Sequence, residues 1–309
     1  MRLYIAGVLF ILVYVTCVSG QAVNSGFVYG RDYTFERMVA TRKVNDAEDK
    51  GTIRLVTYVW RPLQNDRHEV LLFSHGSTGG FATAPAEPFG SFPNPQAVRY
   101  FVARGYTVVA PSRRGRNEST GHYVEECSVA AGDCASSEVT ARGERALREA
   151  LLDTYAVIDQ LILGRLVPHG GKILAVGQSR GGFLSLMLAS NRPELVKGVV
   201  NFAGGWFGAN DQTPPAERQK RIDEEIANLA RAAKRAGMPT IWIYAVRDPW
   251  NREGMPQEFV RAWRDAGGLA EFVYVTEHAL ENGHAILTVP ALWAQQVDAF
   301  LKTTETVKR

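Results

Sequence analysis

The segment from residue 172 to residue 189 constrains the fold more than any other part of the sequence. Its residues 173–176 form a short apolar run of the kind found in buried strands. The pattern Gly-x-Ser-x-Gly follows at residues 177–181, and an apolar stretch without a helix breaker comes next. A side chain at either flanking glycine would crowd a tight turn around the serine. The sequence therefore predicts a buried strand, a sharp turn with Ser179 at its apex, and a helix.

A serine in this setting is a candidate nucleophile. The Gly-x-Ser-x-Gly pattern between a strand and a helix is typical of a nucleophile elbow, in which the N-terminal end of the helix points its N–H groups at the reaction centre. The alternative is an ordinary serine in a plain strand-to-helix turn. A serine nucleophile needs a base, an acid that orients the base, and donors for an oxyanion, so the rest of the chain can be searched for these groups.

Strand and helix patterns alternate along most of the chain. Two β-rich segments, 33–41 and 52–60, flank a charged stretch and predict an antiparallel hairpin. Further strands are predicted at residues 70–73, 106–110, 173–176, 196–202, 240–246 and 271–275, and helices at 96–104, 138–163, 215–236, 257–266 and 291–302. This order predicts the α/β class, with a mostly parallel, doubly wound sheet, antiparallel leading strands and helices on both faces.

The N-terminal residues differ from the rest of the chain. Arg2 precedes an almost wholly apolar run from residue 3 to residue 15, and small residues near Ala22 suit cleavage by signal peptidase. The run is short for a membrane span. We therefore expect a signal peptide at residues 1–22, a mature domain at 23–309, and a secreted or periplasmic protein without a stable membrane span after cleavage. An uncleaved anchor is the alternative.

Net charge and cysteine content limit the classes of partner and ligand that the chain is expected to bind. A formal net charge of +3 over 309 residues gives no case for binding nucleic acid or an anionic membrane surface. Cys127 and Cys134 predict one disulfide in an exported protein, with two free buried thiols as the alternative. Apart from His122, no histidine lies near them at ligand spacing, so no metal site is predicted. Asn117 begins a glycosylation sequon, which has meaning only in a eukaryotic secretory pathway.

A candidate acid follows the strand predicted to end near residue 246. In open α/β sheets, functional residues gather beyond the carboxyl ends of the strands. Asp248 stands at such a position and is suited to hold an imidazolium. The alternative is a carboxylate that caps the turn before Pro249, and Asp211 and Asp265 are weaker candidates for the acid.

A candidate base follows the next strand. His284 lies on a glycine-containing loop before the last predicted helix, from which its ring could reach Ser179. His278 is the weaker alternative. The order serine, aspartate, histidine across consecutive strand exits favours Asp248 and His284 as the partners of the serine.

Oxyanion donors are expected from two backbone positions. The loop His75-Gly76-Ser77 follows the third predicted strand, and the N–H groups of Ser77 and Arg180 would form the oxyanion hole. The alternative is a glycine-rich turn without a donor. Four arginines could place positive charge near the mouth of the site or be solvated surface, and three aromatic residues could line an apolar pocket or pack in the core. They are Arg113, Arg114, Arg116 and Arg180, and Trp206, Phe207 and Trp250.

These motifs resemble those of the α/β-hydrolase superfamily, and within it the dienelactone-hydrolase-like and prolyl-oligopeptidase-like branch. The resemblance extends from about residue 52 to the C-terminus. It is carried by residues 74–76, 105–115 and 177–182, Asp248 and residues 283–284. The resemblance implies a Ser–Asp–His triad, no cofactor, and hydrolysis of an ester or amide. Dienelactone hydrolases differ in using cysteine where Ser179 stands.

The sequence thus predicts a secreted serine hydrolase that cleaves a carboxylic ester through an acyl-enzyme. Ser179 is the expected nucleophile, His284 the base and then the acid, and Asp248 the residue that fixes the tautomer of His284. One alternative is a small serine peptidase that acts on short peptides. Another is a non-catalytic binding protein on a hydrolase scaffold, against which the complete set of triad candidates argues.

Overall fold

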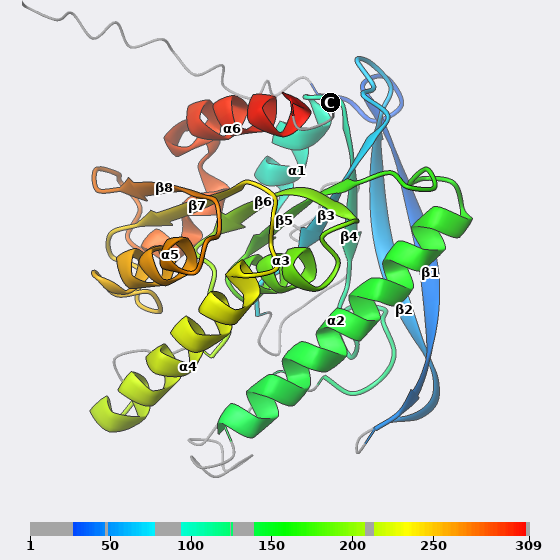
Figure 1. The fold of residues 1–309 in the computed structure, drawn as a ribbon. Coiled ribbons are helices and arrows are strands. Elements are labelled where there is room, and N and C mark those ends of the chain that lie inside the picture. The colour runs from blue at the N-terminus through cyan, green and yellow to red at the C-terminus, as the bar shows by residue number, and fades with distance from the viewer. Residues whose placement is uncertain are drawn as a thin grey trace, which may run out of the picture.

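A computed structural model describes residues 27–46, 49–77, 94–123, 125, 139–207 and 213–306. These residues build a sheet of eight strands in the order β1-β2-β4-β3-β5-β6-β7-β8 (Figure 1). The strands are β1 (Tyr33–Asn45), β2 (Lys50–Pro62), β3 (Glu69–Ser74), β4 (Tyr106–Pro111), β5 (Ile173–Gln178), β6 (Val196–Phe202), β7 (Thr240–Ala245) and β8 (Ala270–Val275).

The sheet is antiparallel only at its leading edge. β1 and β2 form a long hairpin that pairs from Tyr33 with Pro62 to Asn45 with Lys50. β2 is also antiparallel to β4, whereas the pairs from β4 through β3, β5, β6 and β7 to β8 are all parallel. The predicted mostly parallel sheet with antiparallel leading strands is confirmed.

Helices cover both faces of the sheet, as predicted. α1 and α6 lie on one face and α2, α3, α4 and α5 on the other (Figure 1). The helices are α1 (Pro95–Val102), α2 (Val139–Leu163), α3 (Arg180–Asn191), α4 (Pro215–Ala233), α5 (Met255–Asp265) and α6 (Ala294–Thr306). α1 begins where the sequence signals a start, because the side chain of Asn94 accepts hydrogen bonds from Gln96 N and Ala97 N, and Pro95 occupies the first turn.

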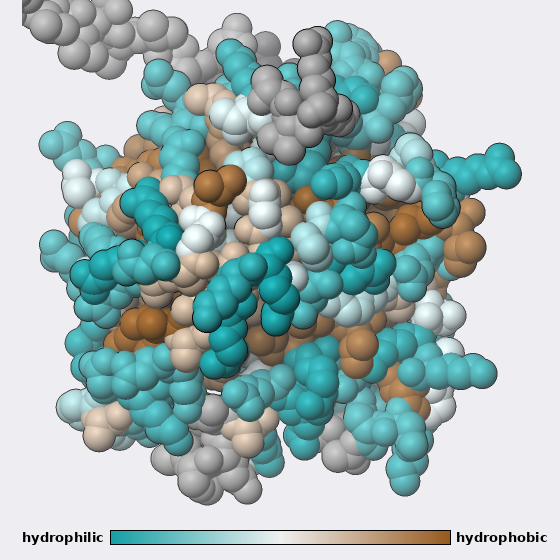
Figure 2. Space-filling model, viewed as in Figure 1, coloured by the Kyte–Doolittle hydropathy of each residue, from teal (hydrophilic) through white to brown (hydrophobic). Residues whose placement is uncertain are grey.

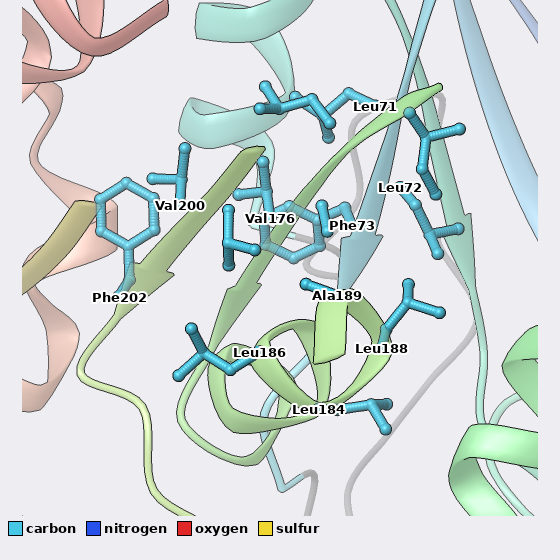
Figure 3. Packing of buried hydrophobic residues seen from close by; sticks show 14 of the residues in the cluster. Leu71, Leu72, Phe73, Val176, Leu184, Leu186, Leu188, Ala189, Val200 and Phe202 are labelled. Carbon is cyan, nitrogen blue, oxygen red and sulfur yellow. The ribbon is translucent and has the colours of Figure 1, made fainter. Parts of the chain in front are cut away.

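Burial on both faces explains why the central strands read as continuous apolar runs. Every residue of β6 is buried, and residues 173–177 of β5 are buried as well. Residues 181–190 of α3 are also buried, because this helix contacts β3, β5 and β6 on one side and α2 and α4 on the others. Figure 3 shows the side chains of Leu184, Leu186 and Leu188 on α3 below the strands that carry Phe73 and Val176.

The surface is mainly polar on the face seen in Figure 1, with smaller hydrophobic areas between the hydrophilic ones (Figure 2). In the part of the chain that the structure describes, no helix combines the length and apolar character needed to cross a bilayer.

The ends of the elements differ most from prediction at the C-terminus. The last helix begins at Ala294 rather than at residue 291, because two short 3-10 helices, η3 (Gly283–Thr288) and η4 (Pro290–Leu292), precede it. Trp293 lies between η4 and α6, fully buried, and its ring packs 4.8 Å from that of Phe202 at the end of β6. The buried ring of Trp293 fixes the chain at the turn that precedes α6.

Three sequence predictions fall outside the described residues, and one of them is the weaker acid candidate Asp211. The signal segment 1–22 and the pair Cys127 and Cys134 lie outside them entirely. The sequon is described: Asn117 Nδ2 donates to Ser112 Oγ at 2.8 Å, and Ser119 is buried, so its hydroxyl serves the fold by accepting from Val56 N at 2.8 Å.

Candidate active site

The turn at Ser179 has the strained geometry that its sequence predicts. Ser179 adopts φ 54° and ψ −128°, a backbone region that residues other than glycine rarely occupy. A Cβ on Gly177 would lie 2.1 Å from Gly181 O, and one on Gly181 would lie 1.9 Å from Ser74 O. Only glycine fits at these two positions, so β5 can end against β3 and α3 can begin directly after the serine.

Backbone hydrogen bonds hold the turn from the neighbouring strand. Ser179 N donates to Phe202 O at 2.9 Å, and Gly205 N donates to Ser179 O at 3.2 Å. The serine is therefore fixed to the end of β6 as well as to its own strand. Because α3 begins at Arg180, the positive end of the helix dipole lies next to the serine.

Asp248 and His284, 36 residues apart in the sequence, meet beyond the ends of β7 and β8. His284 Nδ1 lies 2.9 Å from Asp248 Oδ2 and 3.1 Å from Oδ1. The Asp248 side chain is fully buried, and the His284 side chain is 16% exposed. The arrangement places a buried carboxylate behind a ring that retains access to solvent.

Local bonds orient Asp248 independently of the histidine. Its Oδ1 accepts from Trp250 N at 2.8 Å and from Asn251 N at 3.0 Å, and its Oδ2 accepts from Asn251 Nδ2 at 3.0 Å. Burial pushes the pKa of Asp248 upward, but the hydrogen bond with His284, the charge of that ring and the donors from Asn251 and Trp250 outweigh burial. The net effect is a pKa below the ordinary value, so the group is a carboxylate at neutral pH.

The segment with His284 is tied both to β7 and to the serine turn. Gly283 N donates to Arg247 O at 3.0 Å, and Gln178 Nε2, at the end of β5, donates to His284 O at 2.9 Å. His278 is placed elsewhere, with its Nε2 3.1 Å from Val246 O. The structure thus brings His284, and not His278, to Asp248.

Ser179 and His284 line one pocket of about 470 Å³. Gly76, Ser77 and Arg180 belong to the same lining. A Cβ on Gly76 would lie 3.1 Å from Ser179 Cβ, so the loop after β3 runs directly beside the serine. Much of the remaining wall is apolar and includes the three aromatic residues singled out in the sequence. The apolar lining residues are Trp206, Phe207, Ile222, Trp250, Met255 and Phe259.

Two of the four arginines are not at the mouth of the site, contrary to one of the two readings of the sequence. Arg113 is buried, with its Nε 2.7 Å from Glu125 Oε1. Arg114 is buried too, in ion pairs with Asp46 and Asp153 at 2.7 Å and with Glu149 at 3.2 Å. Several carboxylates surround the guanidinium of Arg114, and one carboxylate, that of Glu125, pairs with Arg113. These ion pairs compensate for the removal of both charges from solvent.

The other two arginines lie nearer the surface. Arg116 lies over the ring of Tyr123, 3.5 Å from its centroid. Arg180 lines the pocket, and its Nε donates to Trp206 O at 3.1 Å.

Glu225 and Asn251 are site residues that sequence reasoning missed. Glu225, on α4, accepts from Trp206 N at 2.9 Å and from Phe207 N at 3.0 Å, and it lines the pocket while being almost fully buried. Burial raises the pKa of Glu225 to about 7, against the opposing effect of those N–H donors. One signal was present: Glu225 follows the buried Ile222 by three positions, so it lies on the apolar face of the helix.

Asn251 could have been found from its spacing, since an asparagine three residues after an Asp-Pro turn is placed to bond with the aspartate. Within the described ranges, no group of three or more histidine, cysteine, aspartate or glutamate side chains is arranged to hold a metal ion.

Solved structures with this fold include both esterases and peptidases. The Pyrococcus furiosus esterase Pf2001 is 18% identical, with a TM-score of 0.57 over 87% of this chain and 90% of that one. The Pyrococcus horikoshii acylaminoacyl peptidase is 16% identical, with a TM-score of 0.56 over 89% of this chain and 41% of that one. A predicted hydrolase from Thermoplasma acidophilum is 14% identical, with a TM-score of 0.53 over 88% and 99% of the two chains.

None of the curated proteins matches the chain. At these identities the solved structures share the fold alone. The sequence profile of the alpha/beta hydrolase family matches residues 71–304, which include the strands from β3 onward and the residues around the pocket. By this match over most of its length, the chain belongs to the α/β hydrolase family.

Proposed function

We propose that the protein is a serine hydrolase that cleaves carboxylic esters, with Ser179 as nucleophile, His284 as base and Asp248 as the acid that orients the base. One observation carries this proposal. His284 Nδ1 lies 2.9 Å from a buried Asp248 carboxylate, and His284 shares a pocket with Ser179. A carboxylate bonded to an imidazole that shares a pocket with a strained serine is consistent with the arrangement that serine catalysis needs.

The proposed proton transfers follow from the contact between His284 and Asp248. A neutral His284 that donates Nδ1–H to Asp248 leaves Nε2 as the acceptor on the pocket side. Ser179 Oγ attacks the ester carbonyl carbon while Nε2 takes the hydroxyl proton. The tetrahedral intermediate then collapses, and His284 returns this proton to the departing alcohol. A water molecule, deprotonated by the same nitrogen, attacks the acyl-enzyme and releases the carboxylic acid.

The N–H groups of Ser77 and Arg180 are the proposed oxyanion donors. Both residues line the pocket with Ser179, and Arg180 is the first residue of α3, where the N–H groups have no partner within the helix. Each such donor is worth about 10²–10³ in kcat when it is aimed at the developing negative charge.

The pocket wall supports an ester with an apolar acyl group as the substrate class. Much of the pocket lining is aromatic or aliphatic, and the pocket volume of about 470 Å³ suits a small organic molecule. An apolar acyl group would gain about 25 cal/mol for each Å² that it buries there.

Labelling and turnover test this proposal. A fluorophosphonate probe should label the wild-type protein and fail to label Ser179→Ala. Well-folded wild type that takes no label would favour a binding protein on a hydrolase scaffold. Parallel assays with p-nitrophenyl acyl esters and aminoacyl p-nitroanilides decide the bond cleaved, and a clear preference for the anilides would overturn the esterase assignment in favour of a peptidase.

We also propose that the mature domain starts at residue 23 and is secreted or periplasmic, with Cys127 and Cys134 joined. This proposal rests on the sequence of residues 1–22 and on the two cysteines that remain after its removal. The intact mass of the protein recovered from the medium or periplasm tests both parts. A mass that retains residues 1–22, or two thiols that react with an alkylating agent without prior reduction, would contradict it.

A further inference from the structure

The loop after β3 is held from behind by three buried side chains that the proposed chemistry does not use. They are Arg113, Glu125 and His75, here called the Arg113 clamp. Arg113 is 7% exposed, Glu125 6% and His75 5%. The three come from different parts of the chain: His75 from the loop itself, Arg113 from the turn after β4, and Glu125 from the segment that follows.

The clamp binds the carbonyl oxygens of the loop. Arg113 Nη2 donates to Gly76 O at 2.6 Å and also to His75 O. His75 Nδ1 lies 2.7 Å from Gly76 O. Arg113 Nη2 and His75 Nδ1 both contact Gly76 O, and these two nitrogens lie 3.3 Å apart. Two consecutive peptide carbonyls are thus turned toward the buried guanidinium.

The direction of the carbonyls fixes the direction of the amides. In a trans peptide the C=O and the N–H of the same unit point to opposite sides. Gly76 O points at Arg113, so the N–H of Ser77 in the same peptide unit points away from Arg113. His75 O also points at Arg113, so the N–H of Gly76 points away from it as well. Ser77 and Gly76 both line the pocket beside Ser179. The clamp therefore turns these N–H groups outward from the buried side.

The clamp is fixed in its protonation state as well as its geometry. Arg113 N donates to His75 Nε2 at 3.2 Å, so Nε2 carries no proton and the neutral ring carries it on Nδ1, where it is donated to Gly76 O. Burial and the charge of Arg113 lower the pKa of His75, which keeps the ring neutral. Glu125 balances the buried arginine, and its Oε2 accepts from Tyr123 Oη at 3.1 Å.

We propose that Arg113, anchored by Glu125, is a positioning residue of the oxyanion hole: it holds the 75–77 loop so that the N–H of Ser77 faces the reacting carbonyl, without touching the substrate. The inference rests on the proposed serine hydrolase function. It assigns to Arg113 an effect on the transition state, where the oxyanion forms, and little effect on the binding of the ester itself.

The test compares Arg113→Lys with Arg114→Lys. Lysine keeps a positive charge beside Glu125 but lacks the planar fork that reaches two carbonyls and a carboxylate together. Arg114 is the matched control, because it is the adjacent residue and is also buried. Its ion-pair partners are the carboxylates of Asp46, Asp49, Glu149 and Asp153 rather than groups of the loop. For both variants, kcat and KM on a p-nitrophenyl ester and the thermal midpoint are measured.

Arg113→Lys should lower kcat by about 10- to 100-fold with KM changed by no more than about twofold, because a displaced donor loses much of its catalytic effect. Arg114→Lys should lower the thermal midpoint and leave kcat within about twofold of wild type. A second variant, Glu125→Gln, keeps the shape and removes the anchoring charge, and it should lower kcat by about 3- to 10-fold at constant KM. Glu125→Gln tests the same proposal if Arg113→Lys does not fold.

The outcomes separate the clamp from the proposed function. Ser179-dependent turnover in wild type, with kcat unchanged in Arg113→Lys and Glu125→Gln, overturns the clamp alone. Equal losses of kcat in Arg113→Lys and Arg114→Lys overturn it too, because they would show a general effect of stability. Wild type without Ser179-dependent turnover overturns the proposed function, and the clamp with it.

Discussion

Replacement of Glu225 by glutamine should remove a pH dependence from the stability of the fold. The carboxyl group is buried between α4 and the backbone of Trp206 and Phe207. Burial raises its pKa from the ordinary 4.5 to about 7. Between these two values the native protein holds a proton that the unfolded chain has released, so the free energy of unfolding falls as the pH rises.

The size of this effect follows from the two pKa values. Each pH unit between 4.5 and about 7 costs up to about 1.4 kcal/mol, which gives a loss of about 3 kcal/mol as an upper bound once the pH exceeds 7. The neutral glutamine of Glu225→Gln cannot release a proton, and its oxygen can still accept a backbone N–H. The stability advantage of wild type over the variant should therefore shrink by about 2–3 kcal/mol between pH 4.5 and pH 8.

Urea unfolding at half-unit steps from pH 4.5 to 8 measures this difference directly. Buried His75 contributes in the opposite direction, because its lowered pKa means that stability is lost as the pH falls below 6.5. Its contribution is common to wild type and Glu225→Gln and cancels in the comparison. Asp223→Asn, at an exposed carboxylate of the same helix, is the control and should give a nearly constant difference. If the Glu225→Gln difference is equally constant, the argument that burial controls this carboxyl group is wrong.

Three further changes test the site and the core. Asp248→Asn should lower kcat for ester turnover by about 10³–10⁴-fold, since the amide favours the wrong tautomer of His284; a loss below tenfold would contradict the assigned role. Gly181→Ala should destabilise the protein by about 3 kcal/mol or more in urea, because its Cβ would lie 1.9 Å from Ser74 O, and an unchanged midpoint would refute the steric argument. Phe202→Ala should cost about 3–5 kcal/mol by the same measurement, whereas Phe202→Leu should cost clearly less, because Phe202 is fully buried at the end of β6.

Much of the fold was readable from the sequence because local patterns and burial agree. The strand predicted at residues 196–202 has those limits in the structure, since every residue in it is buried between two layers of helices. The serine turn was readable for a different reason. Its two glycines are required because a side chain at either position would clash with the backbone, so the Gly-x-Ser-x-Gly pattern itself predicts the tight turn. Asp248 and His284 were found by their places after β7 and β8, where parallel strands direct their carboxyl ends to one edge.

The supporting residues could not be read in the same way, because long-range packing decides their surroundings. Arg113 is charged and lies in a polar turn, and nothing near it in the sequence shows that its side chain points inward. It is buried only because Glu125 and the carbonyls of the 75–77 loop meet it there. Glu225 left a weak signal, as an acid on an apolar helix face, but the backbone groups that it binds are 18 and 19 residues away.

The hydrogen bond between Gly283 and Arg247 has a consequence for the order in which the protein folds. Ser179 is fixed by β5 and β6, whereas His284 reaches its place only after β8 has joined the edge of β7 and Gly283 has bonded to Arg247. These contacts join the last third of the chain to the buried central strands. A refolding chain is therefore expected to bury its central strands first and to regain turnover in a later, slower phase. In the proposed mechanism, Ser179 would reach its native backbone geometry before His284 is in place.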